Sequence, residues 1–312
     1  MPPLTDTPAC AIVNRALAVL VLCCATLSGA IAGRAEGSEP DRAGMPHGNG
    51  RHQRDDVPAG FVRVPAGTAV GGSPTVIEHF CIAKYETTNR DVAEAMQWAY
   101  NQRPPLVRAS STTVRTTKGS REELLDLDAE HCQISFSLGT FSVDAGKEDH
   151  PCVEITWRGA AAYCNFRSAM EERTPCYDLS DWSCDFGAGG YRLPTDKEWE
   201  YAARGGKDGR DTAFSGSNDI DAVAWYFANS GGRSHKVGTK AANELGIHDM
   251  SGNVWEWCHD WYTEGVTRVE RGGSWMNILE DYCRVSNRYK CHPDSYPNRG
   301  FRPAMDAPKA DD

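Results

Sequence analysis

Positive charge is scarce in this sequence. The 312 residues include 33 Lys and Arg against 43 Asp and Glu, which gives a formal net charge of −10. A general nucleic-acid binder carries a basic stripe, and adsorption to anionic lipid also needs basic residues. Neither C-x-x-C nor C-x-x-C-H occurs, which argues against a thioredoxin-like redox motif and c-type haem attachment. We therefore expect no nucleic-acid partner.

Long apolar runs are also scarce, and a single one stands out. Residues 16–32 (ALAVLVLCCATLSGAIA) follow Arg15 and end in Ala30-Ile31-Ala32, the small-x-small pattern that signal peptidase reads. We predict a signal peptide over residues 1–32 and an exported protein, periplasmic or secreted, with no stable membrane span after cleavage. The run is barely long enough to cross a bilayer, so an uncleaved anchor is the alternative.

Export changes how the cysteines are interpreted. Three of the twelve lie in the predicted signal peptide, and in an oxidising compartment the remaining nine favour disulfides, with at least one thiol left over. Cys176 and Cys184 enclose a short loop and form the first predicted pair. Cys258 and Cys283 form the second.

The rest of the chain divides by composition. Residues 33–58 contain almost no large apolar side chains and are typical of a disordered linker. We predict one folded domain over residues 59–306, followed by a tail at 307–312.

Within this domain, alternating apolar residues predict strands at 61–67 and 79–88 and a hairpin over 133–143. Helices are predicted to open at Thr88, Thr156 and Thr195, whose hydroxyl groups can cap a helix start.

Four blocks in the second half carry the strongest signal. They are YRLPTDKEWEYAARGG (191–206), GIHDMSGNVWEWCHDWY (246–262), RGGSW (271–275) and NRGFRP (298–303). Together they resemble the formylglycine-generating enzymes, also called sulfatase-modifying factors, whose fold is a variant of the C-type lectin fold. The resemblance implies an α+β, C-type-lectin-like domain with short strands, few helices and many ordered loops.

The block DMSGNVWEW is a candidate calcium site. Carboxylate and carbonyl oxygens are the ligands that calcium prefers, and a glycine lets the backbone turn around the ion. The resemblance implies that Asp249 and Glu256 bind calcium through their side chains, and Gly252 and Val254 through their carbonyls. The alternative is a turn in which these carboxylates cap backbone N–H groups.

The chemistry of the family is only partly conserved here. Family enzymes oxidise a cysteine of a client sulfatase to formylglycine, with copper held by two cysteines after GGS. The first of these positions is Asn277 here, and Cys283 matches the second loosely. One thiolate and one amide do not make that copper site, so we expect none. No His-x3-His-x-Glu cluster occurs, which argues against an iron-dependent sulfoxide synthase.

Other positions of the family's substrate groove are occupied by side chains suited to binding. They are Trp255, Ser274, Trp275, Asn277 and Arg288. The arginine can bind a carboxylate or sulfate, or form a salt bridge, and the tryptophans can line a groove or fill the core.

Two functions follow from this part of the sequence. The first is an accessory protein that binds a protein or peptide client or a small ligand, or an enzyme of divergent chemistry in the same groove. The second is a formylglycine-generating oxidase that uses Cys283. The missing cysteine at Asn277 favours the first.

Overall fold

The computed structural model describes residues 57–69, 75–295 and 297–307. The predicted signal peptide (1–32), the linker (33–58) and the tail (307–312) lie outside this part, apart from residues 57, 58 and 307. Within the described residues, no helix combines the length and the apolar character needed to cross a bilayer.

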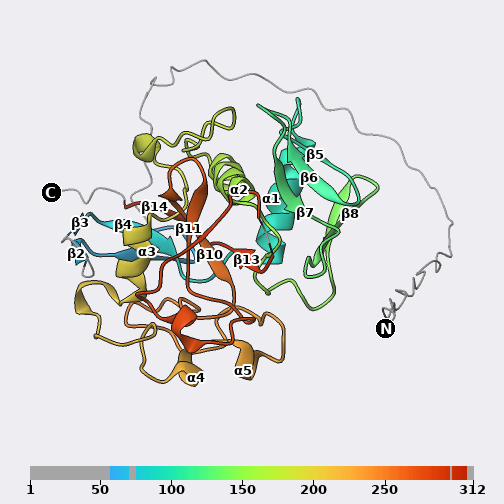
Figure 1. The fold of residues 1–312 in the computed structure, drawn as a ribbon. Coiled ribbons are helices and arrows are strands. Elements are labelled where there is room, and N and C mark those ends of the chain that lie inside the picture. Colours follow the sequence, from blue (N-terminus) through green and yellow to red (C-terminus); the bar gives the residue numbers. More distant parts are fainter. Residues whose placement is uncertain (1–56, 70–74, 296, 308–312) are drawn as a thin grey trace, which may run out of the picture. The chain divides into compact units, whose positions relative to one another are not determined.

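The three longest helices begin where the sequence predicts them (Figure 1), whereas the two short helices of four residues each were not predicted. Thr88 and Thr195 each form a capping box with the residue three positions on, and the Thr156 side chain accepts a hydrogen bond from the Gly159 amide. The helices are α1 (Asn89–Asn101), α2 (Trp157–Met170), α3 (Asp196–Ala203), α4 (Ile220–Val223) and α5 (Phe227–Ser230). Three 3-10 turns are η1 (Phe186–Ala188), η2 (Gly206–Asp208) and η3 (Glu280–Cys283).

Two sheets organise the described residues. The first is antiparallel in the order β1 (Phe61–Val64), β4 (Phe80–Ala83), β14 (Ala304–Asp306). The second runs β12 (Tyr289–Cys291), β11 (Thr267–Arg271), β10 (Trp255–Thr263), β13 (Arg299–Gly300), and its β10–β13 pair is parallel. The C-terminal strand β14 therefore closes a sheet begun at the start of the domain.

Smaller antiparallel groups complete the fold. They are β2 (Gly67–Ala69) with β3 (Thr75–Ile77), β5 (Val107–Ala109) with β6 (Thr113–Thr116) and β7 (Glu123–Asp126), and β8 (Ile134–Ser137) with β9 (Thr140–Val143). The predicted hairpin is confirmed, and its turn places Leu138 and Gly139 at positive φ, as a tight two-residue turn requires. The predicted strand 61–67 is interrupted, because Pro65 has no N–H to donate to a sheet.

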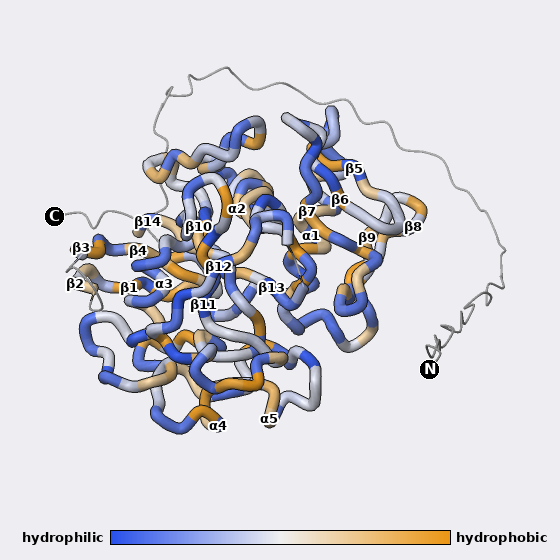
Figure 2. Tube along the Cα trace, viewed as in Figure 1, coloured by the Kyte–Doolittle hydropathy of each residue, from blue (hydrophilic) through white to orange (hydrophobic). Residues whose placement is uncertain are grey.

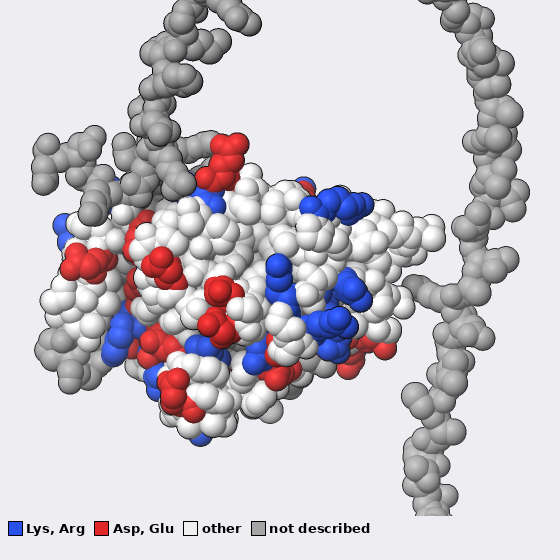
Figure 3. All heavy atoms as spheres, turned by 90° about the horizontal axis from the view of Figure 1, so that it is seen from above, with Lys and Arg blue, Asp and Glu red and all other residues white. Residues whose placement is uncertain are grey.

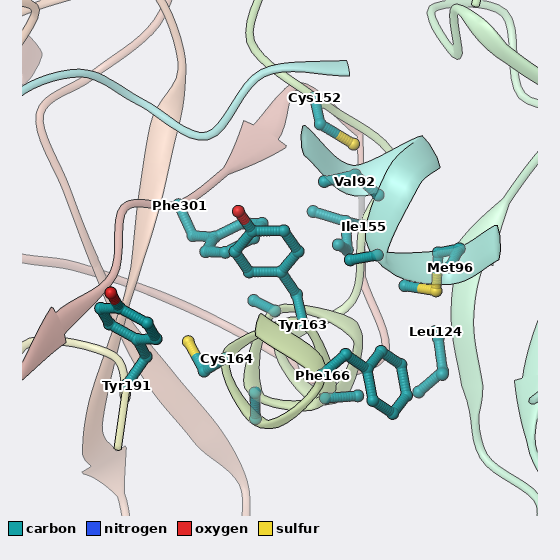
Figure 4. Close-up of a cluster of buried hydrophobic side chains, with 14 of the residues drawn as sticks. Val92, Met96, Leu124, Cys152, Ile155, Tyr163, Cys164, Phe166, Tyr191 and Phe301 are labelled. Carbon is teal, nitrogen blue, oxygen red and sulfur yellow. The ribbon is translucent and has the colours of Figure 1, made fainter. Parts of the chain in front are cut away.

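The main core lies between α1, α2 and their neighbouring strands. Figure 4 shows Val92 and Met96 of α1 directed toward the same interior as Tyr163 and Phe166 of α2. A Cβ on Gly159 would stand 2.0 Å from the Leu124 carbonyl oxygen, so this glycine allows α2 to approach β7 closely. The contact between α2 and β7 therefore leaves no room for a side chain at position 159.

Loops supply much of the remaining core. Apolar and polar residues are interleaved along most of the trace, including the long connections around α4 and α5 (Figure 2). Further buried clusters lie outside the main core, and one of them packs Phe214, Ile220 and Tyr226 around Cys283. On the face seen in Figure 3, acidic and basic side chains stand in small mixed groups.

Candidate functional site

The DMSGNVWEW loop has an unusual backbone that its residues permit. Asp249 and Asn253 have φ near +59°, and Gly252 has φ of +77°. A Cβ at Gly252 would lie 2.4 Å from the Trp225 carbonyl oxygen, so glycine is required here for space as well as for conformation. The loop is thereby held against the segment before α5.

Glu256, a predicted calcium ligand, is committed to a buried ion pair. The Arg302 Nη2 and Nε atoms lie 2.6 and 2.7 Å from its two carboxylate oxygens, and Trp199 Nε1 donates to one of them at 2.8 Å. Both partners are fully buried. A paired, fully hydrogen-bonded charge of this kind is stable in the interior, whereas an unpaired one is not.

Glu86 is a member of this site that the sequence analysis missed. Its carboxylate accepts hydrogen bonds from Asn253 Nδ2 at 2.6 Å and from the Val254 amide at 3.0 Å. Burial raises the pKa of Glu86 well above its usual value, and the nearby Asp249 and Glu256 add to the effect. Three acidic side chains therefore surround one arginine.

The predicted calcium ligands fit a cation only in part. Asp249 accepts a hydrogen bond from the Gly238 amide at 2.6 Å through Oδ2, while its Oδ1 is buried without a partner. Glu256, in contrast, already has donors on both oxygens. Among residues 57–69, 75–295 and 297–307, no three His, Cys, Asp or Glu side chains form a metal-binding group. Calcium at this loop stays a prediction.

The segment after GGS is folded back on itself. Ser274 is fully buried, and its amide and Oγ donate to the Asn277 side-chain oxygen at 2.7 and 3.1 Å. The Asn277 amide in turn donates to the Ser274 carbonyl at 3.0 Å. The side chain at the family's first cysteine position thus closes a turn.

Cys283 is equally committed to the interior. The side chain is fully buried, and a Cβ on Gly273 would stand 2.8 Å from its sulfur. Burial raises the pKa of the Cys283 thiol to about 12, so it is protonated near neutral pH. A buried thiol and an occupied amide oxygen do not fit a copper site made of two thiolates.

The predicted groove tryptophans lie largely inside the protein. Trp255 is buried beneath Tyr289, with ring centroids 5.7 Å apart, and meets the edge of Tyr282 at 6.1 Å. Trp275 is buried too, and its indole Nε1 has no hydrogen-bond partner among the described residues. The ring of His131 stands edge-on to Trp275 at 5.7 Å. Core packing is the main role of both tryptophans.

Arg288 joins a salt bridge at the start of α3. Its Nε lies 2.6 Å from Asp196 Oδ2, and its guanidinium covers the ring of Tyr262 at 4.4 Å. The other oxygen of Asp196 pairs with Arg271, which also binds Glu200. These contacts tie Arg288 to α3 rather than to Ser274 or Asn277.

A surface around Asn277 remains exposed. Four large apolar side chains project to solvent there, those of Phe227, Met276, Ile278 and Leu279. The backbone amide of Phe227 donates a hydrogen bond to the Asn277 carbonyl at 3.2 Å. We call these four residues the apolar rim. The sequence analysis missed the apolar rim, although the run M-N-I-L after GGSW could have indicated it.

The nine cysteines of the described residues are all free. The thiols of Cys176 and Cys184 hydrogen-bond to each other, so the first predicted pair is brought together without a bond. Cys258 and Cys283 lie in different buried clusters. Each side chain is enclosed by its own apolar neighbours, so the structure contains no Cys258–Cys283 disulfide.

Comparison with known protein families identifies the family of this chain. A family model described as the sulfatase-modifying factor enzyme 1-like domain matches residues 46–307. This chain belongs to that family. The resemblance inferred from the four sequence blocks is therefore confirmed.

Two proteins with established names are similar to parts of this chain. Chaperone protein LppX of Paenibacillus barcinonensis is 38% identical over 171 residues, and the match covers 42% of this chain and 61% of that protein. The formylglycine-generating enzyme of Streptomyces coelicolor is 33% identical over 202 residues, and the match covers 54% of this chain and 57% of that enzyme. The chain thus spans about three fifths of the length of these two relatives.

A solved structure, that of CarF, confirms the fold. It superposes with a TM-score of 0.62 at 24% identity, covering 80% of this chain and 99% of CarF. The α+β, C-type-lectin-like fold with short strands and few helices, predicted from the sequence, is the fold observed.

Proposed function

We propose that this protein is a client-binding accessory member of the sulfatase-modifying factor family and does not carry out copper-dependent formylglycine formation. One observation carries the second half of the proposal. The two positions that would supply thiolates hold Cys283, which is fully buried, and Asn277, whose side-chain oxygen caps Ser274. Soft Cu(I) needs two thiolates, and these two positions hold a single cysteine.

The apolar rim supports the first half of the proposal. Exposed large apolar side chains gathered at one place favour an interaction site, whereas isolated ones are ordinary. Met276, Ile278 and Leu279 follow one another around Asn277, and Phe227 is hydrogen-bonded to the same turn. The occupant we propose is an apolar segment of a client protein. A relative named as a chaperone protein also favours a protein client.

The binding half is tested with an unfolded protein as the probe. Suppression of the aggregation of reduced insulin B chain should be clear for the wild type and lost in Ile278→Ser/Leu279→Ser. Val76→Ser is the matched control, because Val76 is 72% exposed and Ile278 is 70% exposed. Equal suppression by the double variant and the control would refute the role of the rim.

The alternative is a formylglycine-generating oxidase that uses Cys283. A peptide carrying a sulfatase-type cysteine, incubated with copper-loaded protein and oxygen, should keep its thiol mass. Appearance of the aldehyde mass, and its loss in Cys283→Ser, would establish the oxidase instead.

Export is part of the same proposal and rests on residues 1–32. We infer a mature N-terminus near Gly33 and, in the oxidising compartment, a bond between Cys176 and Cys184, which lie close enough for the second thiol to affect the pKa of the first. Intact-mass measurement and non-reducing peptide mapping of the exported protein test both points. An intact Met1 on a fully reduced protein would contradict them.

A further inference from the structure

A second site lies at the other end of β10 from Trp255. A pocket of about 410 Å³ opens between the loop before η1 and the hairpin of β10 and β11. The residues that matter for its chemistry are Trp182, His259, Asp260, Trp261, Glu264 and Arg268. None of the residues that line this pocket belongs to the apolar rim.

Arg268 lies between two indole rings in the wall of this pocket. It is buried, and its guanidinium carbon lies 3.7 Å from the ring centroid of Trp157 and 3.5 Å from that of Trp261. Trp261 and Arg268 are cross-strand partners, and the register of the β10–β11 pair shifts on either side of Trp261. A register shift re-aims side chains, and here it accompanies the stacking of indole and guanidinium.

The charge of Arg268 has no carboxylate partner within the described part of the chain. Its Nη1 donates to the His259 carbonyl at 2.5 Å, while its Nε is buried without a partner. Arg192, Arg271 and Arg302, which are also buried, all form ion pairs. Burial lowers the pKa of Arg268 to about 10, in keeping with an uncompensated buried cation. An oxyanion would complete its hydrogen bonding.

His259 supplies a second donor. The Leu193 amide donates to the Tyr177 hydroxyl oxygen, so that hydroxyl is free to donate its own hydrogen to His259 Nδ1 at 3.3 Å. This arrangement leaves the ring proton of a neutral imidazole on Nε2. Burial lowers the pKa of His259 to about 4, with Arg268 adding to the shift, so the ring is neutral near pH 7.

Two carboxylates share the pocket with these donors. Asp260 accepts a hydrogen bond from the Asp196 amide at 2.6 Å, and Glu264 is exposed. Both lie too far from Arg268 to pair with it. These two carboxylates disfavour the binding of a dianion such as phosphate or sulfate, and they attract an ammonium group. The pocket thus offers complementary charges at two places, with indole rings beside them.

We propose that this pocket binds a small zwitterion with one carboxylate and one ammonium group, of the α-amino-acid class. Its carboxylate pairs with Arg268 and accepts a hydrogen bond from His259. Its ammonium group lies on the side of Asp260 and Glu264, and an apolar or planar side chain packs on Trp182 and Trp261. A pocket of this volume holds such a ligand.

The test uses four probes that separate these features. Calorimetry and tryptophan fluorescence would measure binding of L-phenylalanine, phenylacetate, phenethylamine and inorganic phosphate to the full chain. L-phenylalanine should bind at least about tenfold more tightly than any of the other three, a difference set by one additional charged contact. No binding by any probe, or tightest binding of phosphate, would overturn the proposal.

Two variants locate the contacts. Arg268→Gln should abolish L-phenylalanine binding, and Arg108→Gln, at an exposed arginine of β5, is the control. Glu264→Gln changes an exposed side chain and leaves the fold intact even if Arg268→Gln does not. It should weaken L-phenylalanine about tenfold and leave phenylacetate unchanged. Equal affinities in wild type and Glu264→Gln would refute the zwitterion. None of these outcomes bears on client binding at the apolar rim.

Discussion

The interior below the DMSGNVWEW loop and the surface around Asn277 use their side chains differently. In the interior, Glu256 is matched by Arg302 and Glu86 by backbone and amide donors. At the surface, Ile278 and Leu279 are largely exposed to solvent. Buried charged side chains that have hydrogen-bond or ion-pair partners stabilise the fold, whereas exposed apolar side chains are available to a ligand. The predictions below test this division, beginning with the largest effect.

Breaking the interior ion pair should have the largest effect on stability. Arg302→Met leaves the Glu256 carboxylate buried without its cation, which costs about 3–5 kcal/mol of the free energy of unfolding. Urea denaturation measures the loss, with Arg108→Met as an exposed control. A variant as stable as the wild type would mean that the pair does not stabilise the fold.

Calcium binding would add a second cation to the interior below the DMSGNVWEW loop. If Asp249 binds it through the free Oδ1, calcium at a hundred times its Kd stabilises the protein by about 2.7 kcal/mol. Chelation should lower the Tm, added calcium should restore it, and Asp249→Ala should remove the dependence. Identical melting curves for the wild type with and without chelator would exclude the site.

The pH dependence of stability tests the burial of a further acidic side chain, Glu154. Glu154 is buried, and desolvation raises its pKa from 4.5 to about 7. Between these values the folded state binds more protons than the unfolded chain, so this group makes stability fall as pH rises from 4.5 to 7, by at most about 3 kcal/mol.

Glu154→Gln isolates this effect from His259, whose lowered pKa gives the opposite slope. The stability of the variant relative to the wild type should increase as pH rises from 5 to 8. Urea denaturation at several pH values measures the difference. A constant difference over this range would contradict the raised pKa.

At the surface, the expected change in stability is the smallest. Ile278→Ser/Leu279→Ser removes apolar groups that are already in water, so the free energy of unfolding should change by less than about 0.5 kcal/mol. Urea denaturation checks this value. A loss of several kcal/mol would show that the apolar rim belongs to the core, and any loss of client binding would then reflect unfolding.

Features set by neighbouring residues could be predicted from the sequence. The helix starts at Thr88, Thr156 and Thr195 depend on hydrogen bonds within three residues, and each was found where predicted. The tight turn at Leu138 and Gly139 is likewise local. The fold itself followed from four sequence blocks that occur together, which no single block would have indicated.

The partners of charged side chains could not be predicted, because they come from distant parts of the chain. Glu86 meets Asn253 across 167 residues. Asp196 and Glu200 lie on α3, and the structure buries both against Arg271. Helical spacing gives the face of a helix, but not the arginine that another strand brings to it.

The central claim, that this chain lacks the copper-binding thiolate pair, is tested most directly by competition for Cu(I). Reduced protein is titrated against a colorimetric Cu(I) chelator, with wild type, Cys283→Ser and the half-buried control Cys291→Ser compared at pH 7. We predict that all three leave the same amount of copper on the chelator. One equivalent of Cu(I) withdrawn by wild type and Cys291→Ser, but not by Cys283→Ser, would contradict the account.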